Sequence, residues 1–420
     1  MLAYFVPSES RNPHSLDAIR ATTSSPLSRR GLEENLRLAA PAVCLAIPQS
    51  PPLTRRALLA SALAVTACGP RRSRGFSGYA FVANAGARTV SAVDLSSFVL
   101  AKQLAVDGAP AALVPSPLRP SVYALMPETG AICEIAAASL SILRKTRLKT
   151  SAIAMALSAD GKALWVLQPR ALLHLDAATL RELTSITLPA LAADFDLSGD
   201  GRAALALSPG RRLALLRLAD GTFEHMVDAG CEPTTVRFQG NGKQILAASR
   251  TDRSLTIVDS ATGRISVRLP LPIEPANCCF TADGGQMFVT GPGMDAVVIV
   301  YPYQTEVGET ILAGRQPDGM AVCSSPQYLF VANPSSGSVT VLDIDTRKLV
   351  GVVNVGQQPR RIVITPDNRY ALVLNEQSGN MGVIRIASFT ERRHRTDPVP
   401  IFTVVPVGAQ PVAAAVVAMV

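Results

Sequence analysis

The sequence predicts an all-β fold, a β-propeller of four-stranded blades, and three observations lead to it. A unit of about forty residues recurs between Tyr79 and Val420, which is the length of one blade. Within each unit, apolar residues occupy every second position in short runs, as in half-buried strands. Turn residues separate these runs at regular intervals. We count eight units and expect eight blades, with seven as the alternative count.

The clearest unit, residues 328–367, contains all the elements of one blade. It reads YLFVANPSSGSVTVLDIDTRKLVGVVNVGQQPRRIVITPD, and its four apolar runs predict four strands. The segments PSSG, DIDT and GQQP separate the runs. These are turn sequences, because Gly adopts positive φ, Pro fixes φ, and Asp or Ser hydrogen-bonds to the nearby backbone.

The same pattern can be followed along the whole chain. The first strand of each unit begins at Tyr79, Val122, Ala163, Ala203, Gln244, Gln286, Tyr328 and Tyr370. Tight turns such as Asp160-Gly161 and Asn241-Gly242 recur at the ends of units, and these dipeptides favour compact strand reversals. A generic β-sandwich does not predict eight copies in one register, so the repeat favours a propeller.

Three short motifs resemble a known repeat family. The first unit contains FVAN followed by SAVDL, the seventh contains FVAN followed by VTVLDI, and a Gly-x-x-Pro corner recurs from Gly314 and Gly356. At these residues the chain is similar to the YVTN family of β-propeller repeat proteins. The resemblance covers Tyr79 to Val420 and is looser in units two to four. It implies a binding or scaffolding propeller of a family that often has seven blades.

The two ends of the repeat region predict how the ring closes. The segment from Pro411 to Val420 follows a corner and has the composition of a fourth strand, but no first strand comes after it. The first strand at Tyr79 has no fourth strand before it. Pairing the N- and C-terminal strands would remove both exposed sheet edges. We therefore expect one propeller over residues 78–420.

The N-terminal region has the features of an export signal. Arg55 and Arg56 precede an apolar run that ends in Val-Thr-Ala before Cys68, which is typical of a signal peptide over residues 53–67. The Val-Thr-Ala-Cys sequence resembles a bacterial lipobox, which implies lipidation of Cys68. Residues 68–77 then form a tether. Residues 1–52 show no periodicity and are interpreted as an unstructured upstream segment; because a signal peptide begins a chain, an upstream start codon assigned in error would mean that this segment is not translated. We expect an extracytoplasmic protein of the cell envelope, lipid-anchored to a membrane.

Composition argues against several other partners. The net charge of +8 is spread over the chain without the basic and aromatic clusters that nucleic acid requires, so no nucleic-acid partner is expected. Five cysteines in the repeat region give no paired disulfide framework, and His174, His225 and His394 lie in different units. We therefore expect buried free thiols, no metal site, no cofactor and a monomer.

A binding site is expected at the mouth of the central channel, where corners meet the first residues of the innermost strands. Both acidic and basic side chains fall there, so a small anionic or zwitterionic ligand could be oriented; the alternative is that these groups cap the channel and pair with one another. The candidate residues are Asp194, Thr234, Arg237, Asn277, Asp318, Arg360 and Arg361.

Three functions compete at this point. The first is a non-catalytic binding or scaffolding module for a small ligand or an envelope protein, because the motifs GxSxG and the phosphate-binding glycine loop do not occur. The second is a lactonase-like hydrolase that uses the central channel, an analogy of fold alone. The third is an accessory subunit of a periplasmic redox enzyme.

Overall fold

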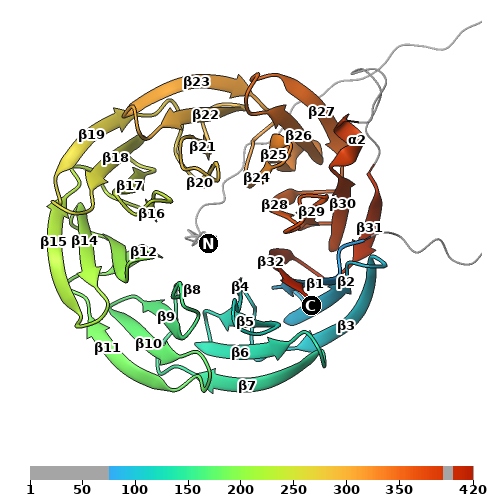
Figure 1. Ribbon diagram of the computed structural model, residues 1–420, viewed down its shortest axis with the longest axis horizontal. Coiled ribbons are helices and arrows are strands. Elements are labelled where there is room, and N and C mark those ends of the chain that lie inside the picture. Colours follow the sequence, from blue (N-terminus) through green and yellow to red (C-terminus); the bar gives the residue numbers. More distant parts are fainter. Residues whose placement is uncertain (1–74, 391–400, 420) are drawn as a thin grey trace, which may run out of the picture. The chain divides into compact units, whose positions relative to one another are not determined.

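The computed structural model describes residues 75–390 and 401–419, and within these ranges the strands form eight four-stranded antiparallel sheets. Figure 1 shows the sheets as blades around a central axis, coloured in chain order. The eight-bladed propeller is thus confirmed, and the seven-bladed alternative is wrong. Helix is nearly absent from the described residues: there is one turn, α2 (Ala387–Thr390), and one short 3-10 segment, Pro334–Ser336.

Each blade runs from an inner strand at the channel to an outer strand at the rim. From blade 1 to blade 8, the inner strands are β32 (Pro411–Ala418), β4 (Ala112–Pro115), β8 (Ala154–Leu157), β12 (Ala192–Leu197), β16 (Thr235–Phe238), β20 (Asn277–Phe280), β24 (Met320–Ser324) and β28 (Pro359–Ile364). The second strands are β1 (Gly78–Asn84), β5 (Ser121–Met126), β9 (Ala163–Gln168), β13 (Arg202–Leu207), β17 (Gln244–Ser249), β21 (Met287–Thr290), β25 (Gln327–Asn333) and β29 (Tyr370–Asn375).

The two remaining positions of each blade lie farther from the axis. In the same order, the third strands are β2 (Thr89–Asp94), β6 (Ala131–Ala136), β10 (Ala171–Asp176), β14 (Arg212–Arg217), β18 (Ser254–Asp259), β22 (Ala296–Tyr301), β26 (Ser338–Asp343) and β30 (Asn380–Arg385). The outer strands are β3 (Val99–Ala105), β7 (Ser141–Arg147), β11 (Glu182–Thr187), β15 (Thr222–Asp228), β19 (Ile265–Pro270), β23 (Glu306–Leu312), β27 (Leu349–Asn354) and β31 (Thr403–Pro406).

The ring is closed by its terminal strands, as expected from the sequence. β32 pairs antiparallel with β1, with Tyr79 opposite Val417 and Val82 opposite Ala414. Blade 1 therefore takes its inner strand from the C-terminal end and its other strands from the N-terminal end of the propeller. This pairing leaves neither terminal strand with a free edge on that side.

The hydrophobic core is divided into layers, one between each pair of neighbouring blades. Side chains alternate along a strand, so Phe81 packs toward blade 2 while its neighbours Ala80 and Val82 pack toward blade 8. All three are fully buried. Because small residues such as Ala413 and Ala415 fill the inner strand of blade 1, the blades can converge toward the axis.

In the regular blades, a buried asparagine holds the corner that leads into the blade. The Nδ2 of Asn375 donates a hydrogen bond to the Val355 carbonyl at 3.0 Å, and that carbonyl precedes Gly356 of the Gly-x-x-Pro corner. Gly356 has φ +151°, and a Cβ there would lie 2.7 Å from Asn375 Nδ2. Asn84 and Gly408 repeat this arrangement in blade 1. The asparagine that ends the second strand of these blades and the Gly-x-x-Pro corner are therefore two halves of one contact.

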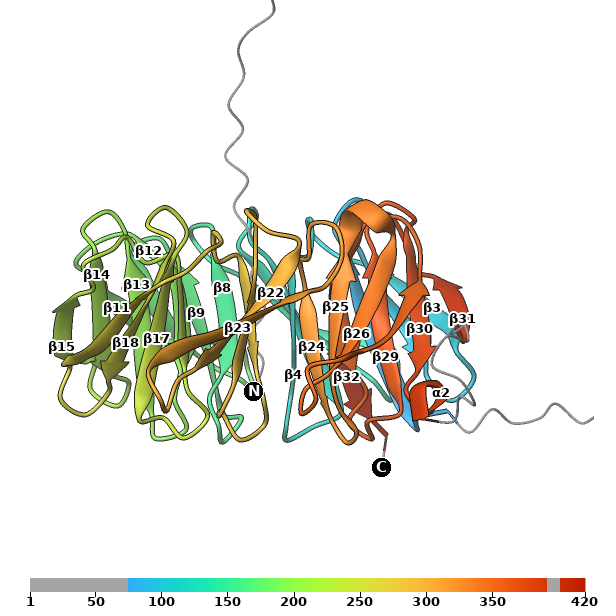
Figure 2. The same cartoon turned by 90° about the horizontal axis from the view of Figure 1, so that it is seen from above.

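The ring has two distinct faces, which Figure 2 shows from the side. On the face called here the corner face, the outer strand of one blade connects to the inner strand of the next. On the opposite face, called the turn face, tight turns join the inner strand to the second strand in blades 2 to 8. The channel mouth expected from the sequence lies on the corner face, where the inner strands begin.

Candidate functional site

Polar side chains on the inner strands are confined to one part of the ring. The inner strands of blades 1, 2 and 3 read PVAAAVVA, ALVP and AMAL, and none carries a charged or amide side chain. The next five inner strands read AADFDL, TVRF, NCCF, MAVCS and PRRIVI. The charged and amide groups predicted at the channel mouth all belong to these five neighbouring blades.

Blades 4 and 5 are joined by a buried ion pair. Arg237 Nη1 donates to Asp194 Oδ2 at 2.6 Å, and the backbone N–H of Val236 donates to the same oxygen at 3.1 Å. Asp194 is only 5% exposed. Burial raises the pKa of Asp194, although the Arg237 charge and the hydrogen bonds act against it. This carboxylate also satisfies a backbone donor on β16.

A second carboxylate, Asp196, was not among the predicted site residues. Its Oδ2 accepts the backbone N–H of Phe238 at 2.8 Å, and burial raises its pKa as well. Burial acts to lower the pKa of Arg237, but attraction from Asp194 and Asp196 outweighs it and raises that pKa. The spacing was an available signal, because residues i and i+2 of a strand share a face.

Blades 6, 7 and 8 are joined by a second polar network. Asn277 Nδ2 donates to Asp318 Oδ1 at 2.5 Å, and Arg360 Nη1 donates to Asp318 Oδ2 at 2.9 Å. Arg361 of blade 8 reaches to blade 6, where its Nη1 donates to Asn277 Oδ1 at 2.9 Å. Arg360 Nε also pairs with Glu376 at 2.8 Å, a partner that the sequence prediction missed. The Arg360 side chain remains 45% exposed.

A close backbone approach positions this network. A Cβ at Gly319 would lie 2.0 Å from the Arg360 carbonyl oxygen and 3.3 Å from the Arg361 Cα. Any larger residue at this position would push β28 away from the start of β24. Gly319 thus allows Asp318 to reach Arg360, although no motif in the sequence singled it out.

One predicted residue does not join either group. The Thr234 hydroxyl donates a hydrogen bond to the Ala248 carbonyl of its own blade, with Oγ1 3.2 Å from the carbonyl oxygen. The other six lie in two contact groups: Asp194 with Arg237, and Asn277 with Asp318, Arg360 and Arg361. Six of the seven candidates are therefore brought into contact with at least one other candidate.

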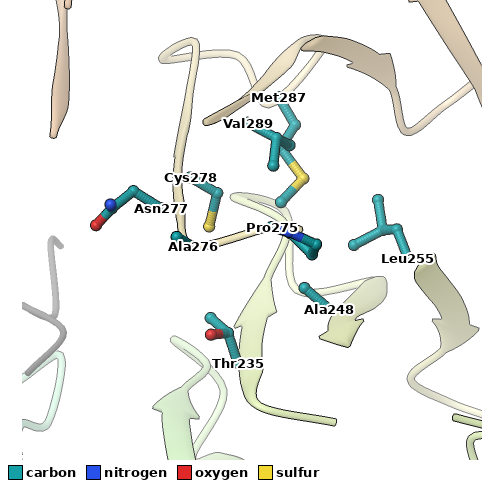
Figure 3. A pocket seen from close by; sticks show the side chains of 9 residues that line it. All are labelled: Thr235, Ala248, Leu255, Pro275, Ala276, Asn277, Cys278, Met287 and Val289. Carbon is teal, nitrogen blue, oxygen red and sulfur yellow. The ribbon is translucent and has the colours of Figure 1, made fainter. Parts of the chain in front are cut away.

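A small cavity lies between blades 5 and 6, and Figure 3 shows the residues that line it. Its volume is about 10 Å³, close to the least that one water molecule needs. Thr235, Ala248 and Leu255 line it from blade 5, and blade 6 contributes the remaining lining, which includes Asn277 and Cys278. The cavity wall is mostly apolar, so it suits a methyl group or a single water molecule.

The cysteines and histidines of the described chain do not converge. Cys133, Cys231, Cys278, Cys279 and Cys323 are free thiols. Burial raises the pKa of the Cys278 thiol, so it stays protonated at neutral pH despite the nearby Arg237 charge.

The histidines lie away from the channel and have structural contacts. His174 of β10 stacks on Trp165, with ring centroids 4.6 Å apart, and His225 of the outer strand β15 lies 3.0 Å from the Ala261 carbonyl. Among residues 75–390 and 401–419, no group of three or more His, Cys, Asp or Glu side chains could hold a metal ion. Cys68 and His394 lie outside the described residues.

Taken together, the geometry defines an eight-bladed β-propeller with a one-sided polar channel mouth. A family model described as "Lactonase, 7-bladed beta-propeller" matches residues 313–397, which is well under half of the chain. The matched stretch begins at the corner into blade 7 and includes Asp318, Arg360, Arg361 and Glu376. No curated protein matches the chain.

Several solved structures share the fold. Dihydro-heme d1 dehydrogenase NirN in complex with DHE superposes with a TM-score of 0.70 at 16% identity, covering 83% of this chain and 78% of that one. Hydrazine synthase from Kuenenia stuttgartiensis gives 0.53 at 19%, covering 66% and 96%. A functionally unknown protein from Desulfotomaculum acetoxidans DSM 771 gives 0.53 at 12%, covering 81% and 99%. At these identities the likeness shows the fold alone.

Proposed function

We propose that this protein is an extracytoplasmic, lipid-anchored propeller that binds a small ligand or an envelope protein at its channel mouth. The observation that supports the proposal is the confinement of charged and amide side chains to the inner strands of blades 4, 5, 6 and 8, with Asp318 just before the inner strand of blade 7. A structural network that only held the ring together would be needed between all blades, but blades 1, 2 and 3 have no such groups on their inner strands. One polar wall facing an apolar wall suits a ligand held from one side.

The charges of the polar wall indicate the chemistry of the ligand. Arg360 and Arg361 supply guanidinium donors near blade 8, whereas Asp194 and Asp196 supply carboxylates near blade 4. Arg360 is the most exposed of the three arginines at the channel mouth, and arginine binds carboxylates through two parallel hydrogen bonds. A small zwitterion or anion, with its carboxylate on blade 8, fits this distribution.

Ligand binding is tested by calorimetric titration of the full chain with three probes: glutamate, succinate and glucose. We expect measurable binding of glutamate or succinate but not of glucose, and loss of that binding in Arg360→Gln. The matched control is Arg170→Gln, an exposed arginine between the second and third strands of blade 3. Binding of none of the probes, or equal binding by the two variants, would contradict a charged ligand at this mouth.

The anchor is tested separately from the channel. Incorporation of a labelled fatty acid should occur in the wild-type chain and disappear in Cys68→Ala. Mass spectrometry of the mature N-terminal peptide gives the same answer independently of where the protein fractionates. An unlabelled wild-type protein would remove the lipid anchor from the proposal but leave the channel site.

A lactonase-like hydrolase is the second candidate, and one observation favours it. The lactonase family match includes Asp318, Arg360, Arg361 and Glu376, which the structure connects in one network. In lactone hydrolysis, a carboxylate could take the proton from the attacking water while an arginine stabilises the oxyanion. Because the match covers only blades 7 and 8, the activity remains a proposal.

An assay of δ-lactone hydrolysis distinguishes the two candidates. Turnover that is lost in both Asp318→Asn and Arg360→Ala, but kept in Asp107→Asn on blade 2, would make the protein an enzyme and overturn the non-catalytic proposal. No turnover by the wild-type chain is the result we expect. The third candidate, a subunit of a redox enzyme, rests on no contact or residue of this structure.

A further inference from the structure

Three neighbouring outer strands carry an apolar surface that differs from the rest of the rim. β27, β31 and β3 belong to blades 7, 8 and 1. β27 and β3 each expose two large apolar side chains, and in blade 8 Val404 of β31 and Phe402 directly before that strand are exposed. We call these six residues the apolar rim: Leu349, Val352, Phe402, Val404, Val99 and Leu100. Figure 1 shows their strands next to one another along one side of the ring.

Charge separates the apolar rim from four of the other five outer strands; the fifth, β19, carries only Arg268 but exposes no large apolar side chain. β27 and β31 read LVGVVN and TVVP, and β3 adds the single cation Lys102, so the three strands carry no acidic residue. By contrast, β11, β15 and β23 each contain glutamate, and β7 contains three basic residues. A surface without acidic groups can approach an anionic layer without repulsion or loss of a solvated carboxylate.

The chain enters the propeller beside this rim. Gly75, the first described residue, lies against the turn between β2 and β3, where a Cβ would be 2.0 Å from the Leu95 carbonyl oxygen. Val99 at the start of β3 follows that turn by a few residues. Gly75 is seven positions after Cys68, and a chain of that length spans at most about 25 Å. A lipid on Cys68 would therefore keep the membrane within reach of blade 1.

From these observations we propose that the apolar rim rests on the lipid bilayer to which Cys68 is attached. The inference rests on the proposed lipid anchor. Exposed Val, Leu and Phe side chains enter the boundary between headgroups and acyl chains, and Lys102 lies among the anionic headgroups. The ring then stands edge-on, with its axis parallel to the membrane, and both the corner face and the turn face stay open to solvent.

Membrane contact by the rim is tested without the lipid by flotation of Cys68→Ala protein with vesicles of phosphatidylethanolamine and phosphatidylglycerol. We expect Val99→Glu with Val352→Glu to lower the bound fraction by about tenfold, because two apolar anchors are replaced by charges. The matched control, Leu183→Glu on β11, changes a side chain that is 56% exposed, against 58% for Val99. Equal loss in the control would overturn the proposal.

A second measurement uses the lipidated wild-type chain. Amide hydrogen exchange should slow at β27, β31 and β3 when the protein is bound to vesicles, and stay unchanged at β11 and β15. If Cys68 carries labelled lipid but exchange is unchanged at all five strands, membrane contact by the apolar rim is refuted and the lipid anchor is supported. If exchange also slows without vesicles, in a way that depends on protein concentration, the apolar rim contacts a second copy of the chain and the membrane proposal is overturned.

Discussion

At the scale of single residues, the Gly-x-x-Pro corner depends on one asparagine side chain and on one glycine that packs against it. Asn375 is fully buried, and its hydrogen bond to the Val355 carbonyl leaves no room for a side chain at Gly356. Since Asn375 also donates to Asn380 at 2.8 Å, it cannot move aside cheaply. The corner therefore requires both residues at once.

Gly356→Ala should lower the free energy of unfolding by about 2 kcal/mol or more, because the new Cβ adds a clash to a φ of +151° that alanine rarely adopts. Urea unfolding followed by circular dichroism gives the value. Gly199→Ala is the control, since a Cβ there meets nothing within 4 Å. Similar losses in both variants would show that the corner contact is not responsible.

The buried charges of blades 4 and 5 predict a dependence on pH. In Arg237→Met, Asp194 and Asp196 lose the opposing cation, so their already raised pKa values rise further. The folded state then binds protons more tightly than the unfolded state, and stability falls as pH rises. We expect a loss of about 3 kcal/mol at pH 7 that shrinks toward pH 5. Unfolding curves at both pH values, with wild type in parallel, would contradict this if the loss were constant.

The sequence predicted most of these residues but not their partners. Asp194, Arg237 and Asn277 could be placed at the channel mouth from the strand pattern alone. Which of them touch depends on how far the ring curves between blades, and a repeat length does not contain that information. Gly319 was missed because its role comes from a neighbouring blade, where it makes room for the Arg360 backbone. Glu376 was missed because it lies beyond the second strand of blade 8, sixteen positions from the Arg360 with which it pairs.

At the scale of elements, the turns on the turn face repeat one hydrogen-bonding scheme. Thr281 Oγ1 donates to Asp283 at 2.5 Å and accepts the backbone N–H of Gln286 at 3.1 Å. Ser158 and Asp160 do the same in blade 3, with a 2.5 Å contact. The Asp-Gly pattern predicted these reversals correctly, since the information lies within four consecutive residues.

Such turns should stabilise the blade only while the aspartate is ionised. The Thr281 hydroxyl and the Gly285 N–H lower the pKa of Asp283, so its contribution is present at neutral pH and is lost as pH falls through that lowered value. We expect Asp283→Ala to cost about 1 kcal/mol or less at pH 7, because the group is solvent-exposed, and almost nothing near pH 2. Thermal melts at the two pH values measure this, with Asp345→Ala as the control. An equal loss of stability at the two pH values would show that ionisation of Asp283 does not stabilise the turn.

At the scale of the whole molecule, closure of the ring is the feature on which the fold depends. The terminal composition predicted that β32 would complete blade 1, and the register from Tyr79–Val417 onward confirms it. The number of blades also followed from the sequence, although the family resemblance pointed to seven. What the repeat could not reveal is the asymmetry of the channel wall or of the rim.

Removal of residues 411–420 should expose β1 and the inner core of blade 1. We expect the truncated protein to be insoluble, or to aggregate rather than remain a folded monomer. Ala413, Ala415 and Val417 would be lost from the layer between blades 1 and 2. The measurement is the soluble fraction after expression, together with size-exclusion chromatography. Deletion of Val420 alone is the control, and a truncated propeller that stayed soluble and melted cooperatively would contradict a need for closure.

The place of β32 in the chain also sets the order of events during synthesis. Every other strand of the described propeller leaves the ribosome before it, so β1 must wait with an unpaired edge while seven blades are made. Closure of the described ring is therefore a late step in folding, because it requires β32.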